Sequence, residues 1–247
     1  MGTAVATRAP LTRALPGRRY DHAFFSAVVA LMLATVVAGF GPTYYYTGFW
    51  KAPLPSPIIH VHAVLFSCWL LMLIAQVSLV SAHRVDVHRR LGIAGCILAC
   101  AMVISGVLAA TDSLNHVPRV PRDVLAFYIV PLSNMVMFSV LMFFAYRLRR
   151  DAASHKRLIM LASTALMIAA VTRWHVVAIR AHTMRASLVS DIFLLMLIAY
   201  DLFSLRKIHR VTIWGGAFLL VVQLTRLPLG ETAAWHHFAG WAQTLAK

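Results

Sequence analysis

The chain has 247 residues, of which 60% are hydrophobic and 13% are charged, and its mean hydropathy is +0.75. Soluble domains carry about twice that share of charged residues, so the composition excludes an ordinary soluble globular protein. The formal net charge of +15 does not indicate a nucleic-acid-binding protein, because the basic residues lie in short segments between long apolar runs. That distribution is typical of a protein that crosses a lipid bilayer several times.

Uncharged runs of about 20 residues, the length that crosses a bilayer, recur along the sequence and predict seven membrane-spanning helices. Their approximate ranges are 22–40, 58–81, 90–110, 124–146, 156–179, 188–205 and 211–228. We therefore expect an all-α, polytopic integral membrane protein that forms a bundle of seven transmembrane helices. Its expected parts are a basic tail at 1–20, the transmembrane domain at 21–229 and an interfacial C-terminal segment at 230–247.

The Lys and Arg residues are divided unevenly between the two ends of this bundle. The tail and the turns at 82–90, 147–157 and 206–210 hold 15 of the 23 Lys and Arg residues. The side richer in Lys and Arg faces the cytoplasm, so we expect a cytoplasmic N-terminus. The Gly- and Pro-rich segment 41–57 predicts a loop. Its aromatic residues favour either a membrane anchor or a lid over a site on the outer side.

Four residues recur at intervals of seven along the second predicted helix: His62, Trp69, Gln76 and His83. Seven residues make nearly two helical turns, so these side chains form one slowly drifting stripe. A polar stripe within hydrocarbon is costly unless it faces protein, water or a cofactor. The stripe therefore predicts a bundle interior that contains a functional group or ligand.

Histidine is the usual nitrogen ligand of haem, zinc, copper and iron. On the predicted outer side we favour His62 and His175 as ligands of haem b, with Arg173 next to His175 as the partner of an anionic group. The same side offers His60, His62 and His175 as ligands of another metal. An arginine within a membrane span needs an anionic partner, for which Asp191, Asp112 and a ligand carboxylate are the candidates.

On the predicted inner side the corresponding haem pair is His88 with His155. One helix would have to serve both sites, since His155 and His175 both lie in 156–179 or directly before it. These two histidines would be about 30 Å apart along that helix and about 200° apart around it. This spacing favours one haem over two, and we favour the outer site.

A short basic phrase repeats on the predicted inner side. Residues 88–93 read HRRLGI and residues 155–160 read HKRLIM. His209 with Arg210 matches only the first part of this pattern. All three stand at expected helix N-termini, where free N–H groups and the helix dipole favour anions. Two interpretations remain open: anchoring to lipid headgroups, and a site for a carboxylated or phosphorylated ligand such as the propionates of haem. Nearby, Asp201 is expected to carry protons or, more simply, to pair with Arg206 or Lys207.

Four segments carry a resemblance to known proteins: GFGPTYY (39–45), HVHAVLFSCW (60–69), VHRRLGIAG (87–95) and HKRLIMLAS (155–163). They resemble a group of bacterial multi-helix membrane proteins to which no activity is assigned, which implies a multi-pass protein of the bacterial inner membrane. More distantly, the histidines near helix ends and the basic turns are similar to those of transmembrane cytochrome b proteins. That likeness implies haem b and quinol as partners, although the fourth predicted helix contains no histidine.

Three functions are consistent with these patterns. The first is a redox membrane protein that binds haem b or another metal through histidines at helix ends. The second is a non-enzymatic binding or transport protein in which the polar stripe lines a path for a small molecule or protons. The third is a structural or assembly subunit with the histidines at an interface.

Overall fold

The computed structural model describes residues 20–46, 56–116, 123–180 and 182–245. The elements in these ranges are α1 (Asp21–Phe40), the π-helical turn η2 (Gly41–Tyr45), α2 (Pro57–Ser81), α3 (Val85–His116), α4 (Val124–Phe127), α5 (Ile129–Arg147), α6 (Ala152–Val171), α7 (Val177–Arg180), α8 (Thr183–Ser190), α9 (Ile192–Leu205), α10 (Arg210–Gly230) and α11 (Ala233–Leu245). Within the described ranges, seven helical segments are long and apolar enough to cross a membrane. The prediction of an all-α protein with seven membrane-spanning helices is confirmed.

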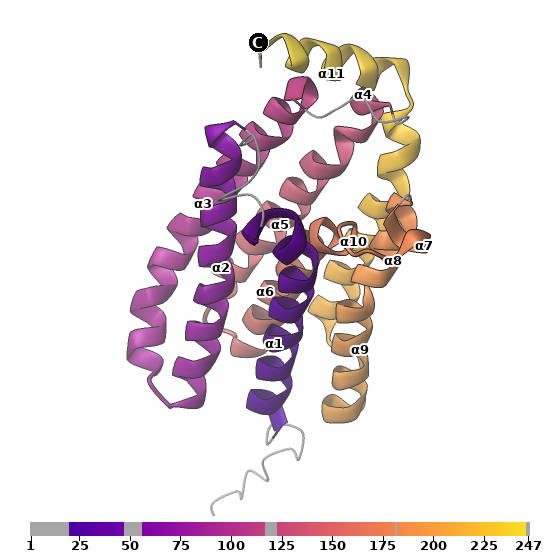
Figure 1. Ribbon diagram of the computed structural model, residues 1–247. Helices are drawn as coiled ribbons and strands as arrows, with labels where there is room; N and C mark the ends of the chain where they lie inside the picture. Colours follow the sequence, from indigo (N-terminus) through magenta and orange to yellow (C-terminus); the bar gives the residue numbers. More distant parts are fainter. Residues whose placement is uncertain (1–19, 47–55, 117–122, 181, 246–247) are drawn as a thin grey trace, which may run out of the picture.

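The long helices stand roughly side by side, and α11 lies across one end of the bundle (Figure 1). We call the opposite end, where α1 begins and the α2–α3, α5–α6 and α9–α10 turns lie, the basic end. The end that carries α4 and α11 is the far end. The hairpins α2–α3 and α5–α6 pack within themselves, α3 packs on α5, and α1 packs on both α6 and α2. This arrangement makes α6 central, and it is buried along most of its length.

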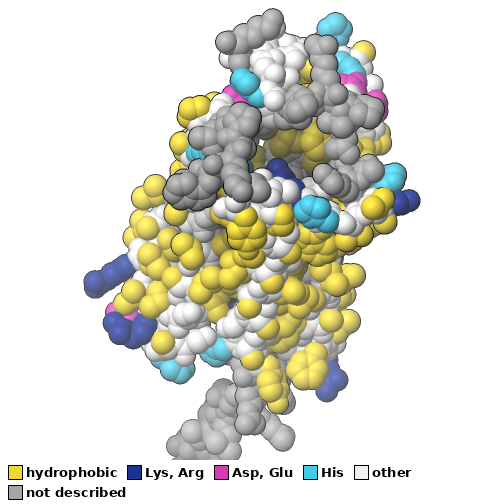
Figure 2. Space-filling model, viewed as in Figure 1, with side chains coloured by type: hydrophobic (Ala, Val, Ile, Leu, Met, Phe, Trp, Pro, Cys, Tyr) yellow, Lys and Arg dark blue, Asp and Glu magenta, His cyan; other side chains and the backbone are white. Residues whose placement is uncertain are grey.

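Hydrophobic side chains cover much of the surface between the two ends (Figure 2). Leu71, Ile97 and Leu195 are each more than 60% exposed, and they lie on three different helices. Apolar side chains on the outside of a bundle are compatible with contact with lipid tails rather than water. The multi-pass membrane protein expected from the sequence is therefore the architecture observed.

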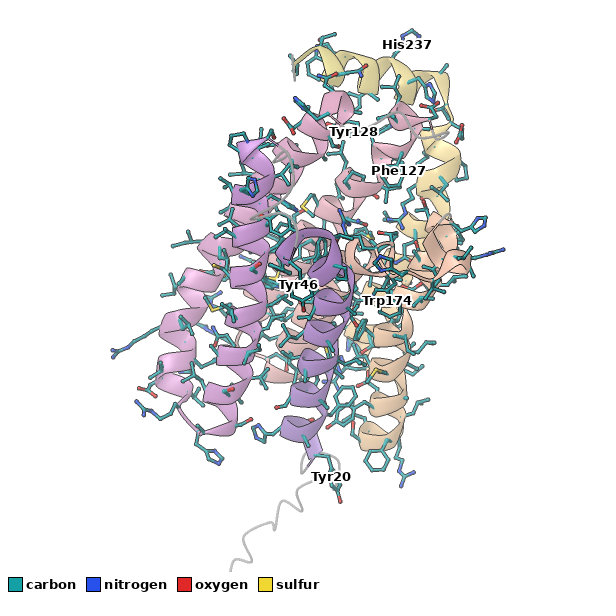
Figure 3. All side chains as sticks on the ribbon, in the orientation of Figure 1. Tyr20, Tyr46, Phe127, Tyr128, Trp174 and His237 are labelled. Atoms are coloured by element: carbon teal, nitrogen blue, oxygen red, sulfur yellow. The ribbon has the colours of Figure 1, made fainter. Side chains whose placement is uncertain are left out.

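Two predicted boundaries were wrong in opposite directions. The segment 41–57 does not begin as a loop, because the chain continues through η2 to Tyr45. The helix predicted over 156–179 ends at Val171, and a turn follows it. Trp174 in that turn lies beside α1 (Figure 3), where its Nε1 donates to the carbonyl of Thr35 at 3.3 Å. Residues 47–55, the rest of the expected anchor or lid, lie outside the described residues.

The GFGPTYY segment joins the end of α1 to α2 and α6. Gly39 lies so close to the backbone of Ala170 that a side chain would collide with it. Further along, Tyr44 shares a 2.7 Å hydrogen bond with Nδ1 of His60, and Tyr45 shares a 2.6 Å hydrogen bond with Ser67. The residues that carry the resemblance therefore hold helices together at this point.

Candidate functional site

The polar stripe on α2 packs largely against protein. Trp69 is buried and its Nε1 donates to Ser163 of α6 at 3.3 Å, while its ring meets Phe138 edge-on. Gln76 contacts α3. His83 lies past the end of α2, exposed and with a positive φ of 58°. The stripe thus marks helix contacts for most of its length, and His62 is the member whose surroundings suit a ligand.

His62 is partly buried between α2 and α3. The backbone of Ser105 lies near enough to act on the ring, and the buried Nδ1 has no hydrogen-bond partner among the described residues. A neutral histidine ring has one nitrogen that can act as an acceptor or a metal ligand. The geometry of His62 therefore fits a single nitrogen ligand or a hydrogen-bond acceptor for a bound molecule.

Arg173 lies near His62, close enough for its charge to act on the histidine ring. It follows the end of α6, and its guanidinium sits 4.3 Å from the ring centroid of Phe40 and donates to the carbonyl of Ala169 at 2.6 Å. The side chain is exposed, yet surrounding protein desolvates it and so lowers its pKa. No described carboxylate lies within ion-pair distance of Arg173, so neither Asp191 nor Asp112 is its partner.

The other outer histidines do not complete a metal centre in the parts of the chain that the structure describes. No group of three or more His, Cys, Asp or Glu side chains there is placed to hold a metal ion. His175 is exposed in the turn after α6, and His60 is engaged by Tyr44. Ligation of haem or metal by His60, His62 and His175 therefore stays a prediction, and one supported at His62 by ring geometry alone.

At the basic end the structure brings His88 and His155 together, with ring centroids 6.5 Å apart and planes nearly perpendicular. Nδ1 of His155 bonds the carbonyl of Ala145 at 2.9 Å. With its side-chain amide turned so that the nitrogen donates, Gln76 bonds Nδ1 of His88. This contact joins α2 to α3, and ligation of haem by His88 and His155 stays a prediction.

A pocket of about 380 Å³ opens at the basic end between the N-termini of α6 and α10 and the start of α1. Its titratable lining consists of Asp21, Lys156, Arg157, Lys207, His209 and Arg210. Two of the repeated basic phrases thus meet at one pocket. The sequence indicated each of these segments but not that they lie together, because α7, α8 and α9 lie between α6 and α10 in the chain.

A buried ion pair forms the base of this region. Asp201 is fully buried and accepts from Nε of Arg157 at 2.9 Å, from Thr212 at 2.6 Å and from the backbone N–H of His209 at 3.0 Å. The expectation that Asp201 pairs with Arg206 or Lys207 was wrong. Arg206 ends α9 in a left-handed conformation, and the partner comes instead from α6, 44 residues earlier in the chain.

Lys156 completes the ionic contacts of the pocket wall. Its ammonium pairs with the carboxylate of Asp21 at 2.5 Å, and Asp21 also accepts a hydrogen bond from Tyr200. This contact fixes the start of α1 against α6 and α9. Lys207 and Arg210 form no ion pair with a described residue.

A second buried polar cluster, which we call the interior cluster, lies between α5, α8, α9 and α10. Arg226 is 2% exposed and donates to Asn134 at 2.8 Å and to Ser187 at 2.6 Å. Gln223, one turn earlier on α10, donates to Asp191 at 3.0 Å. Of these residues the sequence analysis named only Asp191, as a candidate partner of Arg173, and nothing in their spacing predicted that four helical segments bring them together.

Comparisons of this chain with models of protein families, with curated proteins and with solved structures found no match. The resemblance to bacterial multi-helix membrane proteins and to cytochromes b therefore stays a prediction, and function must be argued from the sites themselves.

Proposed function

We propose that this chain is a multi-pass protein of the bacterial inner membrane that binds a small anionic ligand, carrying carboxylate or phosphate groups, at its basic end. The observation that supports this function is the pocket between α6 and α10. Its volume of about 380 Å³ suits a small molecule, and its lining contains five basic side chains against one acidic side chain.

The charge balance favours an anion. Lys156 and Arg157 are neutralised by Asp21 and Asp201, whereas Lys207 and Arg210 have no such partners among the described residues. Arg210 begins α10, where the helix dipole also attracts negative charge. Arginine and lysine at such a position bind carboxylate and phosphate through charge-assisted hydrogen bonds.

A binding measurement on detergent-purified protein tests this function, with inorganic phosphate and citrate as probes. In the variant Lys207→Gln/Arg210→Gln we expect affinity to fall about tenfold to a hundredfold. This corresponds to roughly one charge-assisted hydrogen bond of 1.5–3 kcal/mol, because both side chains are exposed and water screens their charges. The matched control is Arg89→Gln/Arg90→Gln, which removes two exposed charges from α3 outside the pocket. Equal weakening by both variants would mean that overall charge, and not the pocket, governs binding.

Lipid headgroups carry the same phosphate chemistry, so the source of the anion needs its own comparison. The protein is reconstituted in nanodiscs of purely zwitterionic lipid and of lipid with an anionic component. Binding of phosphate or citrate in zwitterionic nanodiscs supports a soluble ligand. Binding that is absent there, while anionic lipid stabilises the wild type more than the Lys207→Gln/Arg210→Gln variant, assigns the pocket to a headgroup.

Electron transfer through haem b, with quinol as the electron donor, is a second candidate function. The observation that favours it is His62, whose buried Nδ1 has no hydrogen-bond partner among the described residues and so could act as a ligand. A reduced-minus-oxidised absorption spectrum of the purified protein tests it. Haem bands that disappear in His62→Ala support this function, and a featureless spectrum from folded protein rejects it.

A further inference from the structure

Asp191 presents an unusual carboxyl group for a membrane helix. It lies at the junction of α8 and α9, inside a membrane-spanning segment, and is 6% exposed. One oxygen, Oδ1, accepts from Gln223 at 3.0 Å. The other oxygen, Oδ2, is buried without a hydrogen-bond partner among the described residues. No described basic side chain lies within ion-pair distance of it.

This environment suits a neutral carboxylic acid. A buried carboxylate is stabilised only by a close counter-charge and by hydrogen bonds to its remaining lone pairs, and Asp191 receives one neutral hydrogen bond. Asp201 shows the contrast within the same chain, because three neighbouring residues donate to it and one of them is an arginine. The two aspartates lie ten residues apart on one helical segment, about 15 Å along its axis, in opposite electrostatic surroundings.

Arg226 is the basic side chain that could form an ion pair with an ionised Asp191. Its guanidinium acts electrostatically on Asp191, but its two terminal nitrogens are bonded to Asn134 and Ser187. Ser187 precedes Asp191 by four residues, one helical turn, so the present acceptor of Arg226 and the carboxyl group lie on the same face. A change in side-chain torsion angles would therefore exchange a neutral acceptor for the carboxylate.

We propose that Asp191 is a proton-binding site in the membrane interior, and that its ionisation draws Arg226 from Ser187 to the carboxylate. Oδ2 takes up one proton from a hydronium ion, which becomes water, and returns the proton to water on ionisation, so no other reactant is needed. The interior cluster then has two arrangements that proton occupancy selects. Such a site serves proton binding or translocation, and it is independent of the anion proposed for the basic end.

Two described arginines of neighbouring segments bond to groups other than Asp191. On α8, Arg185 is exposed and donates to the carbonyl of Ala178 at 3.2 Å. Beyond α6, Arg173 donates to the carbonyl of Ala169. From α10, Arg226 is the basic side chain that faces the carboxyl group across the interior cluster. Among the described side chains, the linkage between proton binding and side-chain position therefore involves one acid, Asp191, and one base, Arg226.

Infrared spectroscopy tests the proposal directly, because a carboxylic acid and a carboxylate absorb at different frequencies. The chain has only eight Asp and Glu residues, so the acid band is uncrowded. We expect the wild type to show a carboxylic acid band at neutral pH and Asp191→Asn to lack it. The amide introduced by this substitution keeps an oxygen that can accept from Gln223, so the variant should fold. The control Asp86→Asn, at an exposed position, should retain the band.

Variants of Arg226 test the linkage. In Arg226→Gln the acid band should persist to higher pH than in Arg226→Lys, because the ionised form has lost its counter-charge. Absence of the band from the wild type, or its survival in Asp191→Asn, would overturn the assignment of the proton. Identical bands in the two Arg226 variants would overturn the coupling. None of these readouts depends on phosphate or citrate. Failure of the proton-site proposal can therefore be distinguished from failure of the anion-binding proposal.

Discussion

The ion pair of Arg157 with Asp201 is the most enclosed charge interaction in the described structure, and its side chains are 3% and 0% exposed. Removing one member of such a pair leaves a buried charge without compensation and costs about 3–5 kcal/mol. We therefore expect Arg157→Gln to lower the free energy of unfolding by that amount. Denaturation in mixed detergent micelles measures it.

Two comparisons separate this effect from a general loss of positive charge. Adding Asp201→Asn to Arg157→Gln removes the uncompensated carboxylate, so the double variant should recover part of the lost stability. Arg150→Gln changes an exposed arginine at the same end of the bundle and should shift stability by less than about 0.5 kcal/mol. A double variant less stable than Arg157→Gln would mean that Asp201 remains well stabilised without its arginine.

His209 gives the protein a pH dependence at the basic end. The residue precedes α10 and its Nδ1 accepts from the backbone N–H of Val211 at 3.2 Å. Burial is the main cause that lowers its pKa, and the charge of Arg157 adds to this. The unfolded chain therefore takes up a proton near pH ~6.5 while the folded chain does not. Stability should fall as the pH drops below about 6.5 towards the lower pKa of the folded state.

The variant His209→Asn isolates this contribution. Asparagine caps helix N-termini well, so the hydrogen bond to Val211 can be kept while the titratable ring is removed. The wild type and His209→Asn should respond alike to alkaline pH, and the wild type should lose more stability as the pH falls below about 6.5. Parallel curves across that window in thermal unfolding would show that His209 is not the group responsible.

Single residues also show how far the sequence predicts the sites. Burial of Trp69 and the interaction of His88 with His155 follow from patterns visible in the chain. The partners of Asp201 and Arg226 do not, because they come from helices 44 and 92 residues away. Local spacing suggests neighbours such as Arg206, whereas the choice among charged partners in a membrane is made by helix packing.

Among the helices, the contact of α1 with α6 depends on Gly39. A methyl group there would lie 3.0 Å from Cα of Ala170 and closer still to its carbonyl group. Neither helix backbone can yield as a flexible side chain would. We expect Gly39→Ala to destabilise the protein by about 1–3 kcal/mol, the usual cost of overpacking. Unfolding in detergent micelles provides the measurement.

Gly240 in α11 is the matched control for Gly39, since nothing lies within 4 Å of the position its side chain would take. Gly240→Ala should be neutral or stabilise the protein by up to about 1 kcal/mol, because alanine favours a helix over glycine. Equal effects at the two positions would mean that helix propensity, and not the α1–α6 contact, determines the result at Gly39.

The length of a helix could be predicted where bilayer thickness determines it. It could not be predicted where contacts with other helices determine where the helix ends. The apolar cores of all seven spans are evident in the sequence, since a bilayer requires them. Nothing in residues 172–179, which lack Gly and Pro, signals the end of α6. There the chain turns where Trp174 and Arg173 meet α1. Conversely, α3 continues to His116, and Asn115 bonds the carbonyl of Gln243 in α11 at 3.1 Å.

At the scale of the whole molecule, polar chemistry is concentrated on the helices around α6 rather than on α2. The pocket of the basic end and the interior cluster share α10, and Asp201 and Asp191 share the segment of α8 and α9. Charged groups at two depths of the same helices can be linked by small movements of those helices. This arrangement explains why the stripe on α2, although conspicuous in the sequence, mainly holds helices together.

The orientation of the molecule in the membrane is testable from its two ends. Lys and Arg residues concentrate at the basic end, so that end should face the cytoplasm and α11 should lie outside. In a background with Cys68, Cys96 and Cys100 changed to serine, an impermeant maleimide should label His237→Cys on intact cells. His237 lies exposed on α11 (Figure 3). Arg149→Cys, in the α5–α6 turn at the basic end, should be labelled only after permeabilisation. The reverse pattern would show that the positive-inside rule fails here and would place the proposed anion pocket outside the cytoplasm.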